Sequence, residues 1–405
     1  MLKSVELFAG AGGLGMGAAL AGFKARAVIE WDRWACDTIE ENKERGFPLV
    51  MDWPLHRGDV REFDYGSLPE GIDLVSGGPP CQPFSIGGKH AGYTDTRDMF
   101  SAMAAVVRRL KPRAFIIENV KGLTRPKFAN YFQYILDQFA MPDIAPREGE
   151  SWYDHLARLE REKTSGRDHG LTYEVNPRLL NAADFGAPQK RERVFIVGFR
   201  GDQAVEWSFP EPTHSADALM RAQWVTGDYW ERHRIPRRLR GKMPDGVAGR
   251  VERLRMSNSA ATSDRFAWRT VRDALVGLPK PREDGETGGR FLNHRLQSGA
   301  RVYKGHTGSP VDQPAKALKA GDHGVPGGEN MMVLPSGEVR YFTVREAARL
   351  QTFPDGYTFH GAWSETMRQL GNAVPVVLAQ RVACSVATKL IEAELRQLAG
   401  RRGVA

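Results

Sequence analysis

A glycine-rich turn between two short apolar segments restricts the fold of this chain more than any other feature. The turn spans residues 9–17, and the segments at 5–8 and 28–30 have the character of buried strands. Its glycines fit the pattern G-x-G-x-x-G, which lets the backbone approach a ligand beside a helix N-terminus: Gly10, Gly12 and Gly15. We therefore predict a β-α-β unit of an α/β fold, with a helix over 18–22 and a ligand at the turn.

The residues that close the second predicted strand indicate which part of a ligand binds there. Glu30 can accept hydrogen bonds from both hydroxyls of a ribose, and Trp31 beside it offers a flat surface for stacking. The glycine pattern alone is a weak signal. Together with an acidic residue about 20 positions further on, it predicts a bound adenosine without specifying which adenosine cofactor.

A cysteine follows another apolar strand at a rigid turn. Residues 72–75 form this strand, and two glycines and two prolines at 77–80 end it and fix the chain before Cys81. In an open α/β sheet this is the edge where ligands bind, so the Cys81 thiolate is a candidate nucleophile. The alternative is a small buried residue without reactivity, which is the usual state of a free cysteine.

Two further segments carry polar side chains of interest. The apolar strand at 114–117 delivers Glu118 to the same sheet edge as the cysteine, and a carboxyl there is costly unless it is used or paired. Gln189, Arg191 and Arg193 alternate along another predicted strand, so they share a face and suit an anionic or carbonyl-rich ligand. The alternatives are a paired structural carboxylate and a solvated strand end.

The composition indicates the charge of a partner and argues against several classes of protein. The 405 residues carry a formal net charge of +8, which suggests an anionic partner, with nucleic acid first. The 3 cysteines are far apart, which argues against a disulfide framework or a zinc cluster and for a reducing compartment. We see no metal-ligand spacing, no signal peptide and no apolar run of membrane-spanning length, so we expect a cytoplasmic protein without a membrane partner.

A change of pattern divides the chain into two predicted domains. The first is 1–200, completed by 341–405, where Thr343 and Glu346 form a capping box and a long helix begins at 376. Between 201 and 340 the alternation of strands and helices is lost and arginines gather, as in a phosphate-facing patch of a separate domain. The alternative for this region is a loop-rich insertion without a ligand.

Taken together, these stretches resemble the C5-cytosine-specific DNA methyltransferases of the bacterial restriction–modification type. The resemblance runs from Phe8 to Val376 and rests on motifs that stand in the family's order: residues 8–13, 79–82, 118–120, 189–193 and 371–375. Each motif is modestly specific, but their combination, with Glu30-Trp31 and Asp59-Val60 between them, is very specific.

The resemblance implies a fold and a cofactor. The fold would be a doubly wound, Rossmann-like α/β sheet with a smaller, loop-rich target-recognition domain inserted before the C-terminal helix. The cofactor would be S-adenosyl-L-methionine, with Glu30 at the ribose and Asp59 at the adenine amino group. The residues that would contact it are Phe8, Ala9, Gly10, Gly12, Gly13, Leu14, Glu30, Trp31, Asp59, Val60, Pro80, Asn372, Ala373 and Val374.

The resemblance also implies a reaction. Cys81 would add to C6 of a cytosine that is flipped out of the duplex, which makes C5 nucleophilic toward the methyl group. Glu118 would hold or protonate N3, and Arg191 would support the O2 side and the surroundings of Cys81. Arg193 would order Glu118 or the end of its strand. The expected DNA contacts are a loop after the cysteine and the arginine patch: Gln82, Ser85, Lys89, Arg97, Arg237, Arg238 and Arg240.

We expect a monomer that acts on double-stranded DNA, with a cognate restriction endonuclease directed to the same site. Three alternatives differ in their residue requirements. A flavin or nicotinamide oxidoreductase would use the glycine turn but would not need residues 79–82. A tRNA C5-methyltransferase would usually carry a Cys-Phe-Thr stretch, which this sequence lacks. A catalytically silent DNA-binding protein would not need the full set of catalytic residues.

Overall fold

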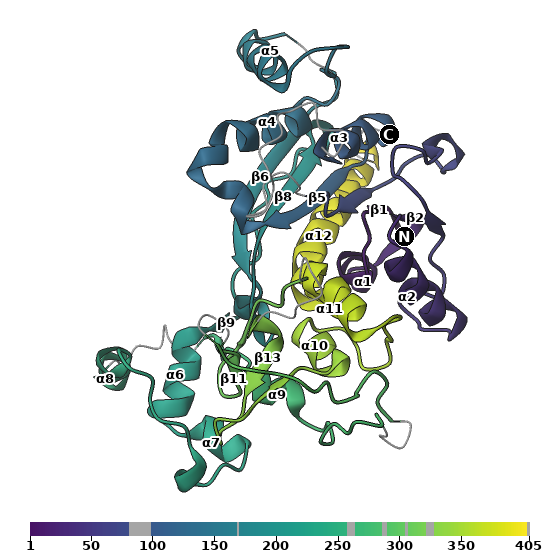
Figure 1. Cartoon of the computed structure of the whole chain (residues 1–405). Helices are drawn as coiled ribbons and strands as arrows, with labels where there is room; N and C mark the ends of the chain where they lie inside the picture. Colours follow the sequence, from purple (N-terminus) through teal and green to yellow (C-terminus); the bar gives the residue numbers. More distant parts are fainter. Residues whose placement is uncertain are drawn as a thin grey trace. The chain divides into compact units, whose positions relative to one another are not determined.

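The computed structural model describes residues 1–80, 99–167, 170–256, 264–285, 290–303, 307–320 and 328–402 (Figure 1). The chain forms two compact units. The first unit comprises Met1–Leu180, Glu192–Pro210 and Ala379–Ala405, and the second comprises Asn181–Arg191 and Glu211–Leu378. The second unit therefore extends beyond the 201–340 segment expected from the sequence, both through residues 181–191 and through the helices that precede 378.

A seven-stranded sheet forms the centre of the first unit, in the order β3-β2-β1-β4-β5-β8-β6 among the described residues. The first five of these strands pair in parallel, and β8 pairs antiparallel to β5. This arrangement confirms the predicted Rossmann-like α/β class. The strands are β1 (Leu2–Leu7), β2 (Phe23–Glu30), β3 (Leu55–Arg57), β4 (Leu74–Gly77), β5 (Ala114–Val120), β6 (Tyr173–Asn181) and β8 (Glu192–Arg200).

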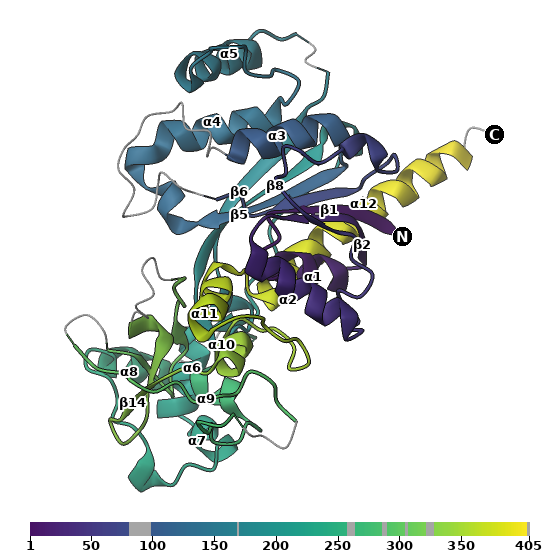
Figure 2. The same ribbon diagram turned by 45° about the vertical axis from the view of Figure 1, so that its right-hand side comes forward.

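Helices cover both faces of this sheet. Figure 2 shows α3 and α4 on one face and α1, α2 and α12 on the other, and α5 packs on α4 through contacts of Trp152 with Tyr131 and Tyr134. The helices are α1 (Gly13–Leu20), α2 (Arg33–Glu44), α3 (Met99–Leu110), α4 (Ala129–Ala140), α5 (Trp152–Thr164) and α12 (Val376–Arg402).

The double coverage explains why the central strands read as continuous apolar runs. Strands buried on both faces need apolar side chains at every position rather than at alternate ones. Leu74, Val75, Phe115, Ile116 and Ile117 are all fully buried. The strand that carries the last three continues through Val120, so the carboxyl at position 118 lies within β5 and not after it as expected.

Short strands and short helices make up the second unit. Its strands are β7 (Gln189–Lys190), β9 (His214–Ser215), β10 (Phe266–Ala267), β11 (Ser309–Pro310), β12 (Ala315–Lys316), β13 (Met331–Val333) and β14 (Val339–Tyr341). Its helices are α6 (Ala216–Trp224), α7 (Asp228–Arg232), α8 (Ala248–Met256), α9 (Val271–Leu275), α10 (Val344–Leu350) and α11 (Trp363–Asn372). The described residues of this unit contain no strand longer than three residues.

A buried arginine joins several loops of the second unit. Arg345 is fully buried in α10, and its guanidinium donates hydrogen bonds to the backbone oxygens of Leu292 at 3.0 Å, Pro354 at 3.2 Å and Tyr357 at 2.6 Å. Buried carbonyl groups need a donor, and short strands leave many of them without one. The guanidinium provides these donors from a single side chain.

Two predictions about the C-terminal third are confirmed. Thr343 and Glu346 form the expected capping box at the start of α10. The long helix that was expected to begin at residue 376 is α12, and its apolar residues Val382, Val386 and Leu390 are fully buried. In the described part of the chain one stretch, Trp363–Ala399, is apolar and long enough to cross a membrane, but 56% of its most apolar window is buried in the protein.

Candidate active site

The glycine turn leaves β1 through backbone conformations that few residues adopt. Phe8 has φ of 53°, which is rare for a residue with a side chain, and such strained residues gather at functional sites. Gly10 and Gly12 also have positive φ, and α1 begins at Gly13, earlier than expected. The Ala9 N–H donates to the Ile29 carbonyl at 3.2 Å, which keeps the turn beside the end of β2.

Glu30 at the end of β2 holds this turn in place. Its Oε2 accepts from the Gly10 N–H at 2.7 Å, and its Oε1 accepts from the N–H groups of Trp31 at 2.9 Å and Asp32 at 2.7 Å. Burial raises the pKa of the Glu30 carboxyl, and the three N–H groups oppose that rise. A carboxylate has about four acceptor positions, so Oε2 has room for one further donor, such as a ribose hydroxyl.

Next to this carboxyl, Trp31 presents a flat apolar surface. Its side chain is 69% exposed, although large aromatic residues are usually well buried. The other expected cofactor residues of the first unit lie around the same strand ends. Gly13, Leu14 and Val60 are buried, and Pro80 is exposed.

Asp59 forms a local ion pair. Its carboxylate accepts from the Arg61 backbone N–H at 2.8 Å and pairs with the Arg61 guanidinium at 2.5 Å. The hydrogen bonds from Arg61 lower the pKa of Asp59, so this group is ionised at neutral pH. An ionised carboxylate at this loop can accept a hydrogen bond from an amino group, as expected for the adenine end of the cofactor.

Glu118 and Arg193 form a buried ion pair between neighbouring strands. The Arg193 Nε lies 2.8 Å from the Glu118 Oε1, and both side chains are largely buried. Burial lowers the pKa of Arg193, whereas the Glu118 charge opposes that change. Arg193 therefore contacts Glu118 directly, which is consistent with an ordering role. The contact forms because β8, which carries Arg193, pairs antiparallel with β5, which carries Glu118.

The residues just before the cysteine lie against Glu118. A Cβ atom built on Gly78 would stand 3.2 Å from the Glu118 Oε2, so only glycine fits there without displacing the carboxyl. The Asn119 side chain donates to the Pro79 carbonyl at 2.9 Å and joins the end of β4 to β5. Cys81, and with it Gln82, Ser85, Lys89 and Arg97, lies outside the described residues.

Arg191 does not share a strand with Arg193. The chain leaves β7 at Lys190 and enters β8 at Glu192. Burial still alternates along this stretch, and Gln189 and Arg191 both bond to the backbone of Leu318, so these two side chains share a face as expected, whereas Arg193 pairs with Glu118. Arg191 is fully buried, and its guanidinium donates to the carbonyl oxygens of Leu318 at 3.0 Å and Gly371 at 2.5 Å. Its catalytic role remains a prediction.

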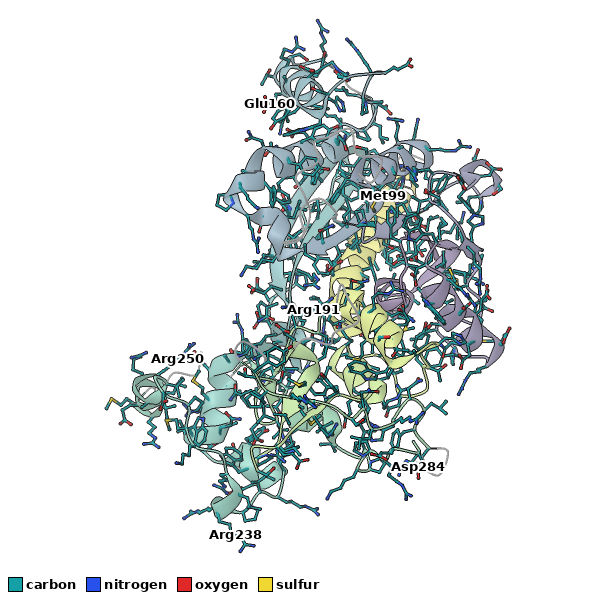
Figure 3. All side chains as sticks on the ribbon, in the orientation of Figure 1. Met99, Glu160, Arg191, Arg238, Arg250 and Asp284 are labelled. Carbon is teal, nitrogen blue, oxygen red and sulfur yellow. The ribbon has the colours of Figure 1, made fainter. Side chains whose placement is uncertain are left out.

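The remaining expected contacts lie in the second unit. Asn372 is exposed, whereas Ala373 and Val374 are buried at the end of α11. Arg237 and Arg238 are exposed, and Figure 3 shows Arg238 at the outer edge of the ribbon. Arg240 is half-buried, because its guanidinium stacks over Trp230 and donates to the Ile235 carbonyl at 3.2 Å.

Two residues near the turn were not predicted from the sequence. The Trp53 ring packs beneath Gly12 and Gly15, where added Cβ atoms would stand 3.0 Å and 2.9 Å from it. Glu6 is buried in β1 below the same turn. A charged residue inside an apolar strand was the available signal for Glu6, whereas the contact of Trp53 depends on chain folding that no local pattern encodes.

The family model described as C-5 cytosine-specific DNA methylase matches residues 2–142 and 166–388. Type II methyltransferase M.Eco47II of Escherichia coli is 30% identical over 389 residues, which cover 94% of this chain and 78% of that protein. Type II methyltransferase M.NgoMIV of Neisseria gonorrhoeae is 29% identical over 388 residues, covering 94% and 95%. The gap in the family match contains α5.

Solved structures with the same fold cover nearly the whole chain. One is a DNA modification methyltransferase encoded within an E. coli prophage, with a TM-score of 0.57, 21% identity and coverage of 96% of this chain and 100% of that one. Another is the Dnmt2 methyltransferase of S. pombe, with a TM-score of 0.54, 16% identity and coverage of 97% and 99%. At such identities these likenesses concern the fold alone.

Proposed function

The chain belongs to the family of C-5 cytosine-specific DNA methylases, and we propose that it methylates C5 of a flipped cytosine in double-stranded DNA through a covalent Cys81 adduct. DNA cytosine methyltransferase activity follows from the family and from the Type II methyltransferase relatives. The observation that carries the finer proposal is the buried Glu118–Arg193 pair, which lies against the residues that lead to Cys81.

We propose S-adenosylmethionine as the cofactor, with the first unit contributing the glycine turn, Glu30, Trp31 and Asp59. The open acceptor position on Glu30 can accept a hydrogen bond from a ribose hydroxyl. The exposed Trp31 ring can stack on the adenine or lie against the sulfonium of the methionine part. When bound, the cofactor would supply an electrophilic methyl group. These side chains would bind and orient it, and the turn would let its methionine part approach the backbone.

Cytosine C5 is a poor nucleophile, and the proposed addition of a thiolate at C6 makes it reactive toward the methyl group. Addition of the Cys81 thiolate to C6 forms a C–S bond and shifts the electrons of the C5–C6 double bond toward C5. Glu118 stabilises this change by a hydrogen bond or proton at N3, and Arg193 fixes the direction of the Glu118 carboxyl. C5 would then acquire the methyl group of the sulfonium, whose sulfur would leave as a neutral thioether. A base removes the C5 proton, the electrons of that bond re-form the C5–C6 double bond and expel the Cys81 thiolate, and any proton on N3 returns to Glu118.

The target-recognition role is proposed for the second unit. Its exposed Arg237 and Arg238 would contact phosphates, a contribution that positions a protein on DNA without reading its sequence. The first unit provides the chemistry, so we expect substitution of these arginines to weaken DNA binding more than cofactor binding.

The test is methylation of unmodified plasmid DNA by the purified full chain, with 5-methylcytosine mapped at base resolution. We expect modification of one cytosine within a fixed sequence, abolished by Cys81→Ala and lowered about a hundredfold or more by Glu118→Gln. Cys384→Ala is the matched control, because Cys384 is a half-buried thiol of α12 outside the proposed site.

Duplex DNA that contains 5-fluorocytosine tests the adduct itself. In the presence of S-adenosylmethionine, C5 would acquire the methyl group while it still carries fluorine. Fluorine cannot leave as a cation, so the electrons needed to expel the thiolate are not released and the complex survives denaturation. We expect a stable complex with the unsubstituted enzyme and with Cys384→Ala, but none with Cys81→Ala. Methylation without a trapped complex would reject the covalent route, and no modified cytosine at all would reject the proposed substrate.

A further inference from the structure

A buried carboxyl and a buried hydroxyl meet directly below the glycine turn. Glu6 in β1 is 3% exposed, and Ser76 in β4 is 1% exposed. The two residues are opposite each other in the parallel pairing of these strands. The Ser76 hydroxyl donates to the Glu6 Oε2, which joins the two central strands through their side chains. The proposed reaction uses neither residue.

Glu6 also bonds to the first turn of α1. The first N–H groups of a helix lack partners within it, and a side chain at the N-cap commonly accepts from one of them. The N-cap of α1 is Gly12, which has no side chain to accept such a hydrogen bond. The backbone N–H of Gly15 donates to the Glu6 carboxyl instead, so a residue of β1 caps the helix that follows the turn.

Packing leaves this arrangement little freedom. A Cβ atom on Gly15 would stand 2.9 Å from the Trp53 ring and 3.6 Å from the Glu6 carboxyl carbon. The turn therefore rests on a platform formed by Glu6 and Trp53. A shift of the carboxyl would displace the backbone that is expected to meet the cofactor.

The other member of the pair belongs to the strand that leads to the proposed nucleophile. Ser76 precedes Cys81 by 5 positions in the sequence. Between them, Gly78 lies against Glu118, and Pro79 accepts a hydrogen bond from Asn119. One hydrogen bond thus joins the cofactor turn on one side to the approach to the nucleophile on the other.

We propose that Glu6 and Ser76 are positioning residues that hold the glycine turn and the end of β4 in a fixed relation, so that the methyl donor and Cys81 are aligned. This inference rests on the proposed function. Burial raises the pKa of Glu6 to about 8, so its carboxyl is mainly protonated at neutral pH, and a glutamine can replace it with the same shape and charge.

The test combines three substitutions in the full-length enzyme with two separate readouts. S-adenosylmethionine affinity is measured by calorimetry without DNA, and kcat is measured on unmodified plasmid DNA at saturating cofactor. Glu6→Leu removes the cap of α1, and an unsatisfied buried N–H costs enough that we expect a cofactor Kd about tenfold higher or more, together with a lower kcat. Glu6→Gln keeps both hydrogen bonds and should stay within about threefold of the unsubstituted enzyme in both quantities.

Ser76→Ala separates positioning from binding. Glu6 keeps its bond to Gly15 in this variant, so we expect the cofactor Kd to change less than about threefold while kcat at saturating cofactor falls about tenfold. Ser4→Ala is the matched control, since Ser4 is a buried serine on the same face of β1. It should leave both quantities unchanged, and thermal unfolding of every variant shows whether it folds.

Several outcomes would overturn the inference. Glu6→Leu that binds cofactor like the unsubstituted enzyme would remove the capping role, and Glu6→Gln as impaired as Glu6→Leu would show that more than the two hydrogen bonds is involved. Ser76→Ala with unchanged kcat would remove the link to the nucleophile. If the unsubstituted enzyme binds cofactor but does not methylate DNA, the proposed substrate fails, while the comparison of cofactor affinities still tests the cap.

Discussion

The two units of this protein satisfy their buried backbone in different ways. In the first unit, long strands pair with one another, and apolar side chains such as Phe115 and Ile117 fill both faces of the sheet. In the second unit the strands are two or three residues long, and buried side chains donate to loop carbonyls, as Arg345 and Arg191 do. Regular pairing needs only apolar residues, whereas irregular chain needs specific polar partners.

The difference implies that the two units respond differently to substitution. Loss of a methyl group in a sheet core removes a little apolar contact and leaves every backbone bond in place. Loss of a guanidinium among loops leaves several carbonyl oxygens without a donor at once. The following predictions compare these costs, from the largest to the smallest.

Arg345→Met should have the largest effect. Three carbonyl oxygens lose their donor, the one of Tyr357 in a buried bond and those of Leu292 and Pro354 in half-buried ones, at about 1–3 kcal/mol each, so we expect the free energy of unfolding of the second unit to fall by about 3 kcal/mol or more. Urea denaturation followed by tryptophan fluorescence measures the change. Arg295→Met is the control, since Arg295 is exposed and donates to one carbonyl, that of Glu283.

The comparison fails if Arg345→Met and Arg295→Met shift the urea midpoint equally. That result would mean that the loops of the second unit find other donors or water once the guanidinium is gone. A large shift for Arg345→Met alone would sharpen the contrast between the units.

Ile117→Val tests the first unit and should have an intermediate effect. The side chain is fully buried in β5, and removal of one methyl group there costs about 1 kcal/mol. Urea denaturation should therefore show a modest shift, with DNA methylation retained. A loss as large as that of Arg345→Met would show that the sheet tolerates change no better than the loops, and Leu179→Val, at an exposed position of β6, provides the baseline.

Lys121→Ala should have the smallest effect. Lys121 and Glu192 form an ion pair at 2.8 Å, but their side chains are 57% and 45% exposed. Exposed pairs of this kind contribute less than about 1 kcal/mol, and salt screens them. We expect an unfolding free energy within about 0.5 kcal/mol of the unsubstituted protein. A larger loss that persists in 1 M salt, where screening is nearly complete, would contradict this assignment.

Much of the first unit could be predicted from local sequence. The apolar runs at β4 and β5 and the glycine turn each depend on neighbouring residues, and their burial in the structure follows the predicted pattern. The extension of β5 through Glu118 was not predicted, because a charged residue directly after an apolar run usually indicates the end of a buried strand. Its partner Arg193 comes from an antiparallel strand 75 positions further along the chain, and pairing at that distance has no local signal.

The candidate site was predictable in part for the same reason. Glu30 has its expected place beside the turn, because turn and strand end are close in sequence. The alternation of Gln189 and Arg191 also has a local pattern, but the carbonyl partners of the Arg191 guanidinium, on Leu318 and Gly371, lie 127 and 180 positions further along the chain. The Glu6–Ser76 bond joins residues 70 positions apart, so only the sheet order shows it.

The division of the chain has a consequence for engineering. The backbone passes from one unit to the other after Leu180, Arg191, Pro210 and Leu378. Grafting the second unit onto a relative would therefore require four junctions, and two of them flank the short stretch that carries Gln189. If only the segment Glu211–Leu378 were exchanged, the recipient would keep its own version of the stretch Asn181–Arg191. That stretch would then pack against side chains of the donor with which it did not evolve.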